Sequence, residues 1–139
     1  MSDSLRDRYA ALPKAHLHVH LEAAMRESTL RQWCAEDGIE VPPLVDYPDF
    51  TQFLDAYGVL IGLLHTPERV ERLLDEVAAD AAAQGVVALE YASIPEKAAA
   101  FGTAEEALEF ILPAAAEAGR RHGVWTGAIV SIDRGAGPD

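Results

Sequence analysis

The stretch LPKAHLHVHLEAA, residues 12–24, holds three of the five histidines in the chain, at alternate positions. Successive side chains of a β-strand point to opposite faces, so this alternation predicts a strand with one polar and one apolar face. The polar face is expected to be His16, His18, His20 and Glu22, and the apolar face Ala15, Leu17, Val19 and Leu21.

The polar face of this strand has the spacing of a metal site. Cα atoms two residues apart on a strand are separated by about 6.5 Å, so His18 and His20 can converge on one ion at about 2.0–2.1 Å per nitrogen. An HxH pattern also arises by chance, with each imidazole satisfied by a backbone carbonyl. A cluster of three histidines on a first strand favours ligation, because unpaired buried imidazoles cost desolvation free energy.

Two further strands and four helices are expected along the chain. Residues 85–93 and 123–132 are nearly continuous apolar runs, typical of parallel strands that are buried on both faces, whereas residues 14–21 alternate. Helices are expected at 28–37, 49–65, 67–84 and 104–122. The order of these elements predicts an α/β protein with right-handed crossovers.

The expected helices carry start and stop signals. The starts are Ser28, Thr66 with Pro67, and Thr103 with Glu106, and the stops are Gly38, Gly85 and Gly123. Pro113 is expected to kink or divide the last helix. The helix at 49–65 has an apolar side, which predicts packing against a core and consists of Phe50, Phe53, Leu54, Tyr57, Leu60, Ile61 and Leu64.

The net charge and the apolar runs of the chain limit the classes of molecule that it can bind. The chain has 139 residues and a net charge of −12, which repels phosphate backbones and acidic membrane surfaces, so a nucleic acid polymer is excluded as a partner. No apolar run approaches the roughly 20 residues of a membrane span, and residues 1–14 lack the apolar core of a secretory signal, so a cytoplasmic location is expected. The single cysteine, Cys34, is expected to be a buried apolar residue.

Residues 12–24 resemble the first-strand signature of the adenosine deaminase family, PKxELHxHLxG. Residues 85–95, GVVALEYASIP, and 129–135, IVSIDRG, resemble the second-strand and third-strand stretches. The resemblance implies that residues 1–139 are the N-terminal part of a domain of this family. It also implies the first three strands, with their helices, of a (β/α)8 barrel.

The resemblance further implies an activity and a partial site. His18 and His20 would be two ligands of one Zn²⁺ ion, His20 would also line the substrate pocket, and Glu22 would bind a sugar hydroxyl. The implied reaction is hydrolytic deamination of adenosine or a related 6-aminopurine nucleoside, with zinc activating the attacking water. The remaining zinc ligands and the general acid and base are expected beyond residue 139, so this chain supplies no catalytic group of that kind.

Three residues depart from the family pattern. His16 stands where the family usually has Glu, and it is interpreted as a structural residue of the barrel interior. Ala23 replaces the usual Gly, and Ala92 stands where an Arg commonly follows Glu90.

Two other histidines are expected to be structural. His65 and Glu68 have the spacing of a His-x-x-Glu motif, but they are expected to lie at the start of a helix. His122 is expected to lie at the C-terminal end of another helix.

An incomplete barrel has predictable properties. Catalytic zinc needs three protein ligands, so the isolated chain is expected to bind zinc weakly and to lack turnover. Its exposed sheet is expected to promote self-association. The alternatives are a sibling deaminase of another aminopurine, a non-catalytic remnant that binds a partner, and another metal-dependent hydrolase or phosphoesterase that shares HxH.

Overall fold

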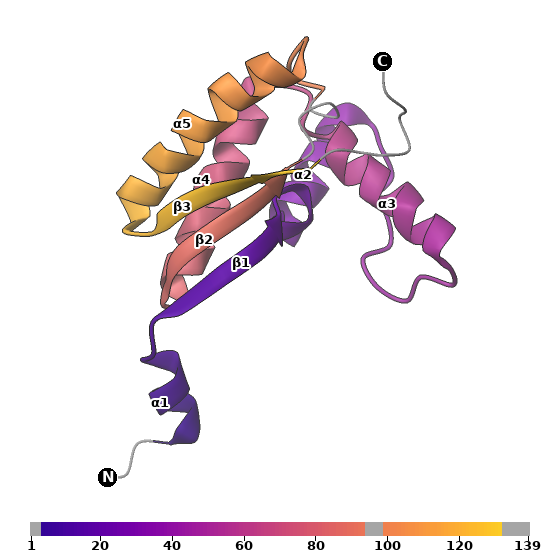
Figure 1. Ribbon diagram of the computed structural model, residues 1–139. Coiled ribbons are helices and arrows are strands. Elements are labelled where there is room, and N and C mark those ends of the chain that lie inside the picture. Colours follow the sequence, from indigo (N-terminus) through magenta and orange to yellow (C-terminus); the bar gives the residue numbers. More distant parts are fainter. Residues whose placement is uncertain (1–3, 94–98, 132–139) are drawn as a thin grey trace.

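A parallel three-stranded sheet forms the centre of the molecule (Figure 1). The computed structural model describes residues 4–93 and 99–131. Strands β1 (Lys14–His20), β2 (Val86–Ser93) and β3 (Trp125–Val130) lie side by side in that order. Helices α4 (Pro67–Ala83) and α5 (Ala104–His122) cover one face of the sheet. The predicted α/β class and the three strands are confirmed, while residues 94–95 and 132–135 of the expected family stretches lie outside the described residues.

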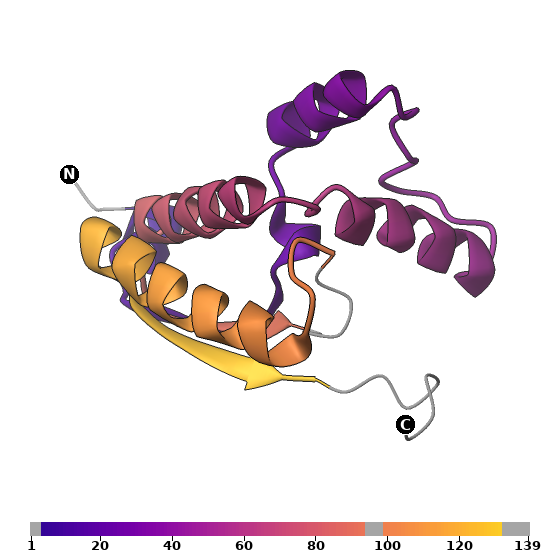
Figure 2. The ribbon, with the colours of Figure 1, turned by 90° about the horizontal axis from the view of Figure 1, so that it is seen from above.

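Four shorter elements precede or follow the first strand in the sequence. Helix α1 (Leu5–Ala10) precedes β1 and has a capping box formed by Ser4 and Asp7; it is not among the helices predicted from the sequence. The 3₁₀ turn η1 (Glu22–Ala24), helix α2 (Glu27–Asp37) and helix α3 (Phe50–Gly62) follow β1. Figure 2 shows α2 and α3 on the side of the molecule where β1 ends. They therefore lie near the carboxyl ends of the strands, which is where (β/α)8 enzymes place their active sites.

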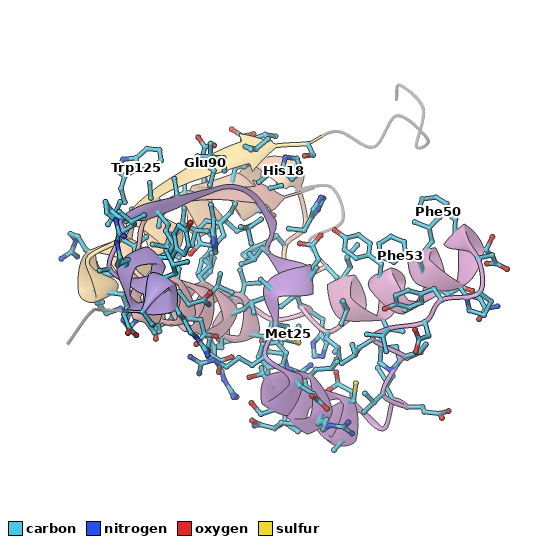
Figure 3. All side chains as sticks on the ribbon, turned by 90° about the horizontal axis from the view of Figure 1, so that it is seen from below. His18, Met25, Phe50, Phe53, Glu90 and Trp125 are labelled. Carbon is cyan, nitrogen blue, oxygen red and sulfur yellow. The ribbon has the colours of Figure 1, made fainter. Side chains whose placement is uncertain are left out.

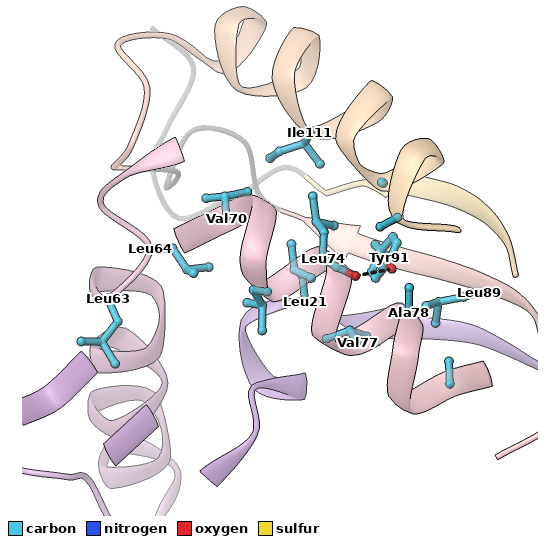
Figure 4. Packing of buried hydrophobic residues seen from close by; sticks show 14 of the residues in the cluster. Leu21, Leu63, Leu64, Val70, Leu74, Val77, Ala78, Leu89, Tyr91 and Ile111 are labelled. Atoms are coloured by element: carbon cyan, nitrogen blue, oxygen red, sulfur yellow. Dashed lines mark hydrogen bonds between the residues drawn. The ribbon is translucent and has the colours of Figure 1, made fainter. Parts of the chain in front are cut away.

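The hydrophobic core lies between the sheet and the helix pair α4 and α5. The apolar stripe expected on α4 is buried, and the residues buried on this helix are Val70, Leu73, Leu74, Val77, Ala78 and Ala81. They meet Leu89 and Tyr91 of β2 and Ile111 of α5 (Figure 4). The Tyr91 hydroxyl donates to the Leu74 carbonyl oxygen, and burial raises the pKa of this phenol.

Most of the expected helix boundaries are confirmed. Thr66 and Thr103 accept hydrogen bonds from backbone N–H groups at the starts of α4 and α5. Gly38 and Gly123 adopt the left-handed conformation that ends α2 and α5. Pro113 does not divide α5, which runs unbroken through it.

The expected start of α2 was wrong. The N-cap position is Arg26, and Ser28 lies inside the helix. Contacts between helices account for this start, because the Arg26 guanidinium binds Asp80 of α4 at 2.8–2.9 Å and the Thr29 hydroxyl donates to Glu76 at 2.6 Å. Tertiary contacts therefore outweigh the local capping preference of Ser28.

Helix α3 exists, but only the last part of its apolar side packs against the core as expected. Among its residues only Ala56 is buried, and Phe50 is 70% and Leu54 47% exposed. The first part of the apolar side of α3 is therefore exposed, whereas Leu60 packs against the core and Leu64, directly after the helix, is buried in it.

Within the described residues, no helix is both long and apolar enough to cross a membrane. Cys34 is fully buried, as expected, and burial raises the pKa of its thiol.

Candidate metal and substrate site

The alternation of β1 is interrupted by a β-bulge. Between His16 and Val19 the strand advances three residues, while its partner β2 advances two, from Leu89 to Tyr91. A bulge adds one residue to a strand and so changes which face the following side chains occupy.

As a result, His16 and Val19 share a face, and both line a cavity together with Val77 and Ala81 of α4. The expectation that His16 shares a face with His18 and His20, inside the barrel, was wrong. His16 pairs with Leu89, which is buried in the core, and so lies on the face of the sheet toward the helices.

His18 and His20 do converge. Their Nε2 atoms are 3.3 Å apart, and their ring centroids are 5.1 Å apart. Two nitrogens bound to a tetrahedral zinc ion at about 2.0–2.1 Å must themselves lie about 3.3 Å apart. The pair therefore fits two ligand positions of such an ion, and both side chains are exposed to incoming ligands.

The described residues supply no complete metal centre. Across residues 4–93 and 99–131, no group of three or more His, Cys, Asp or Glu side chains is placed to hold a metal ion. The part of the chain that the structure describes thus brings together two imidazole nitrogens, fewer than the three protein ligands that a catalytic zinc ion needs.

Glu22 lies next to this pair, at the start of the turn after β1. It is only 6% exposed, and the Tyr57 hydroxyl of α3 donates a short hydrogen bond to its Oε1. The Tyr57 oxygen is also 3.1 Å from Nδ1 of His20. Burial and the neighbouring Glu22 carboxylate raise the pKa of Tyr57, so this phenol stays protonated.

Tyr57 contacts both Glu22 and His20, and it was not among the site residues predicted from the sequence. Its position in the apolar side of α3 suggested a core residue. The available signal was its hydroxyl, because a half-buried tyrosine usually needs a hydrogen-bond partner. Tyr57 also continues an aromatic row along α3, stacking on Phe53, which in turn stacks on Phe50. Figure 3 shows the rings of Phe50 and Phe53 projecting from the same side of α3, with His18 on the sheet.

His65 and His122 lie at helix boundaries, as expected from the sequence. His65 precedes the N-cap of α4, and its Nε2 lies 3.0 Å from Asp37 and 2.9 Å from an Arg69 nitrogen. His122 is the last residue of α5 and contacts Asp75 at 2.9 Å.

The two alanines that depart from the family pattern differ in burial. Ala92 is fully buried on β2, where it pairs with His20. Ala23 is exposed in η1.

Three parallel strands with two candidate ligands at the carboxyl end of the first strand match the opening part of a (β/α)8 barrel, in which active sites lie at that end of the strands. The family model for adenosine deaminase matches residues 13–138, and the chain belongs to that family.

Three similar proteins illustrate the relationship. An adenine deaminase of Streptomyces coelicolor is 32% identical over 92% of this chain and 40% of its own length. The crystal structure of an adenine deaminase from Arthrobacter aurescens matches with a TM-score of 0.71 and 25% identity, over 88% of this chain and 40% of that one. A Burkholderia ambifaria amidohydrolase with bound Zn matches with a TM-score of 0.70 and 23% identity, over 97% of this chain and 40% of that one. The chain thus spans about 40% of the length of these proteins.

Proposed function

We propose that the chain forms part of a zinc-dependent deaminase that hydrolyses the amino group of a 6-aminopurine, giving the 6-oxo product and ammonia. The observation that carries the proposal is the 3.3 Å separation of the His18 and His20 Nε2 atoms at the carboxyl end of β1. This spacing suits two ligands of one zinc ion, and a protein of similar fold contains zinc.

Each site residue has a distinct role in this proposal. His18 and His20 hold the metal through Nε2, and the bound zinc would supply the activated water for hydrolysis. Glu22 binds the substrate through a carboxylate oxygen, because Tyr57 occupies only Oε1. His20 also contacts the substrate, since it lies between the metal position and the Tyr57 and Glu22 pair.

The substrate is proposed to be adenosine or a related 6-aminopurine nucleoside, with Glu22 receiving a sugar hydroxyl. A second candidate is a sibling deaminase whose substrate is the free base. It is supported by the adenine deaminases that this chain resembles.

A chimeric enzyme tests the proposal. The matching segment of the Streptomyces coelicolor adenine deaminase is replaced by this chain, and ammonia release from adenine and from adenosine is measured. Zinc-dependent activity that is lost in His18→Ala and His20→Ala, and kept in His16→Ala, is expected. A folded, zinc-loaded chimera without activity, or activity that is independent of His18 and His20, would overturn it. The ratio of the two activities separates the two substrate candidates.

The isolated 139-residue chain is proposed to be inactive and to associate with itself. Exposed apolar side chains lie on both outer strands of the sheet, including Leu17 of β1 and Trp125 and Val130 of β3. Unpaired strand edges of this kind favour pairing with a second copy. Sedimentation should show oligomers, and a monomer at all concentrations would contradict this part of the proposal. A cytoplasmic location stays a prediction.

A further inference from the structure

Three side chains from separate elements form a continuous hydrogen-bonded row beside the proposed metal position. Glu22 of η1, Tyr57 of α3 and His20 of β1 meet at the Tyr57 oxygen. At the far side of its ring, His20 presents Nε2 toward Nε2 of His18, 3.3 Å away. The row therefore runs from a buried carboxylate to a nitrogen that faces the proposed metal.

The hydrogen atoms available to each group determine which group donates and which accepts at each contact in this row. An ionised carboxylate only accepts hydrogen bonds, and a tyrosine hydroxyl has a single hydrogen to donate. Because that hydrogen goes to Glu22, the Tyr57 oxygen can only accept in its 3.1 Å contact with His20. The donor in this contact must be the Nδ1–H group of His20.

We propose that Tyr57 is a positioning residue that selects the Nδ1–H tautomer of His20, with the Glu22 carboxylate fixing the direction of the Tyr57 hydroxyl. A neutral imidazole that carries its hydrogen on Nδ1 has a lone pair on Nε2. The row thus aims a lone pair, rather than an N–H, at the position between His20 and His18.

The consequence for metal binding rests on the function proposed above. A histidine that binds a metal usually donates its other ring N–H to a carboxylate or carbonyl, which fixes the tautomer and ring orientation. Here a tyrosine stands between the histidine and the carboxylate. The same row links Glu22, proposed to bind substrate, to His20, proposed to bind zinc, through one hydroxyl of α3.

The tautomer is measurable without any metal. Long-range ¹H–¹⁵N correlation spectra of the ¹⁵N-labelled 139-residue chain, recorded with a chelator present and at a pH where imidazoles are neutral, distinguish Nδ1–H from Nε2–H histidines. The Nδ1–H form should predominate for His20. In Tyr57→Phe the acceptor is lost and the ring is kept, so the Nδ1–H form should fall from the major to the minor population.

Two changes at Glu22 test the direction of the row. In Glu22→Leu the Tyr57 hydroxyl loses its acceptor and becomes free to donate to Nδ1, so His20 should switch to the Nε2–H form. In Glu22→Gln the amide oxygen still accepts, so the Nδ1–H form should be largely kept. This pair also tests the inference if Tyr57→Phe fails to fold.

Tyr47→Phe is the matched control, because the Tyr47 hydroxyl donates to the Pro43 carbonyl oxygen and is not part of the row. It should leave the His20 tautomer unchanged, and the His65 and His122 signals report whether each variant is folded. An Nε2–H form of His20 in the unaltered chain, or an unchanged tautomer in both Tyr57→Phe and Glu22→Leu, would overturn the inference.

A zinc titration of the same samples separates the two proposals. Tyr57→Phe should weaken zinc binding by about 10–100-fold relative to Tyr47→Phe, the usual effect of losing such a partner. If the tautomer follows the expected pattern and zinc does not bind through His20, the proposed metal role fails and the inference about Tyr57 stands.

Discussion

Helices α3 and α4 have similar apolar stripes in the sequence and different surroundings in the structure. Six residues of α4 are buried against the sheet and α5, whereas α3 buries only Ala56. The partners of the α4 stripe are present in this chain. Helix α3 instead lies by the end of β1, where its Tyr57 contacts Glu22 and His20. An apolar stripe therefore predicts a helix reliably, but it does not distinguish a core face from one that borders a site.

The largest expected difference between the two helices comes from truncating a leucine in each. Leu74 of α4 is fully buried, and Leu54 of α3 is 47% exposed. Leu74→Ala should lower the free energy of unfolding by about 2–5 kcal/mol through lost burial and a cavity. Leu54→Ala should change it by less than about 0.5 kcal/mol. Urea unfolding of the two variants measures the difference, and equal losses would show that α3 is as tightly packed as α4.

Replacing a helical glycine by alanine is expected to change the stability of the fold by a smaller amount, destabilising it in α5 and stabilising it in α3. A Cβ atom at Gly119 of α5 would lie 2.4 Å from the Val124 carbonyl oxygen, while one at Gly58 of α3 would meet nothing within 4 Å. Gly119→Ala should destabilise the fold by about 1–3 kcal/mol through overpacking. Gly58→Ala should stabilise it by roughly 0.5–1 kcal/mol through helix propensity. Thermal unfolding checks both signs, and a stabilising Gly119→Ala would contradict the close contact between α5 and Val124, the residue before β3.

The smallest expected effect concerns the contact between α2 and the start of α4. Arg69 binds Asp37 at 2.6–2.8 Å and lowers the pKa of that carboxyl to about 2. A lowered folded-state pKa adds stability that is present above the unfolded value of about 4 and lost as the pH falls toward 2. Asp37→Asn should therefore flatten the loss of stability between these pH values.

Denaturant midpoints measured across this range test the Asp37 effect. Asp46→Asn is a suitable control because Asp46 lies in the loop before α3. An acid profile that is the same in Asp37→Asn and the unaltered chain would contradict the contribution of this ion pair.

Much of the fold was predictable because its signals are local. The Thr66 and Thr103 caps and the Gly38 and Gly123 ends each depend on a few neighbouring residues, and all four are confirmed. Ser28 failed as a cap because contacts from Arg26 to α4, which are distant in sequence, set the start of α2.

The site was predictable only in part for the same reason. Strict alternation correctly brings His18 and His20 together, because no register change separates them. It misplaces His16, because the β-bulge depends on pairing with β2, some 70 residues away. The role of Tyr57 depends on where α3 lies relative to β1, which no local pattern specifies.

A zinc titration of the 139-residue chain by calorimetry, with three single histidine variants, tests the proposed metal site most directly. We expect weak binding that is lost in His18→Ala and in His20→Ala and is unchanged in His16→Ala, which lies on the helix-facing side of β1. Binding that depends on His16 as strongly as on His18, or that survives the loss of both His18 and His20, would contradict it.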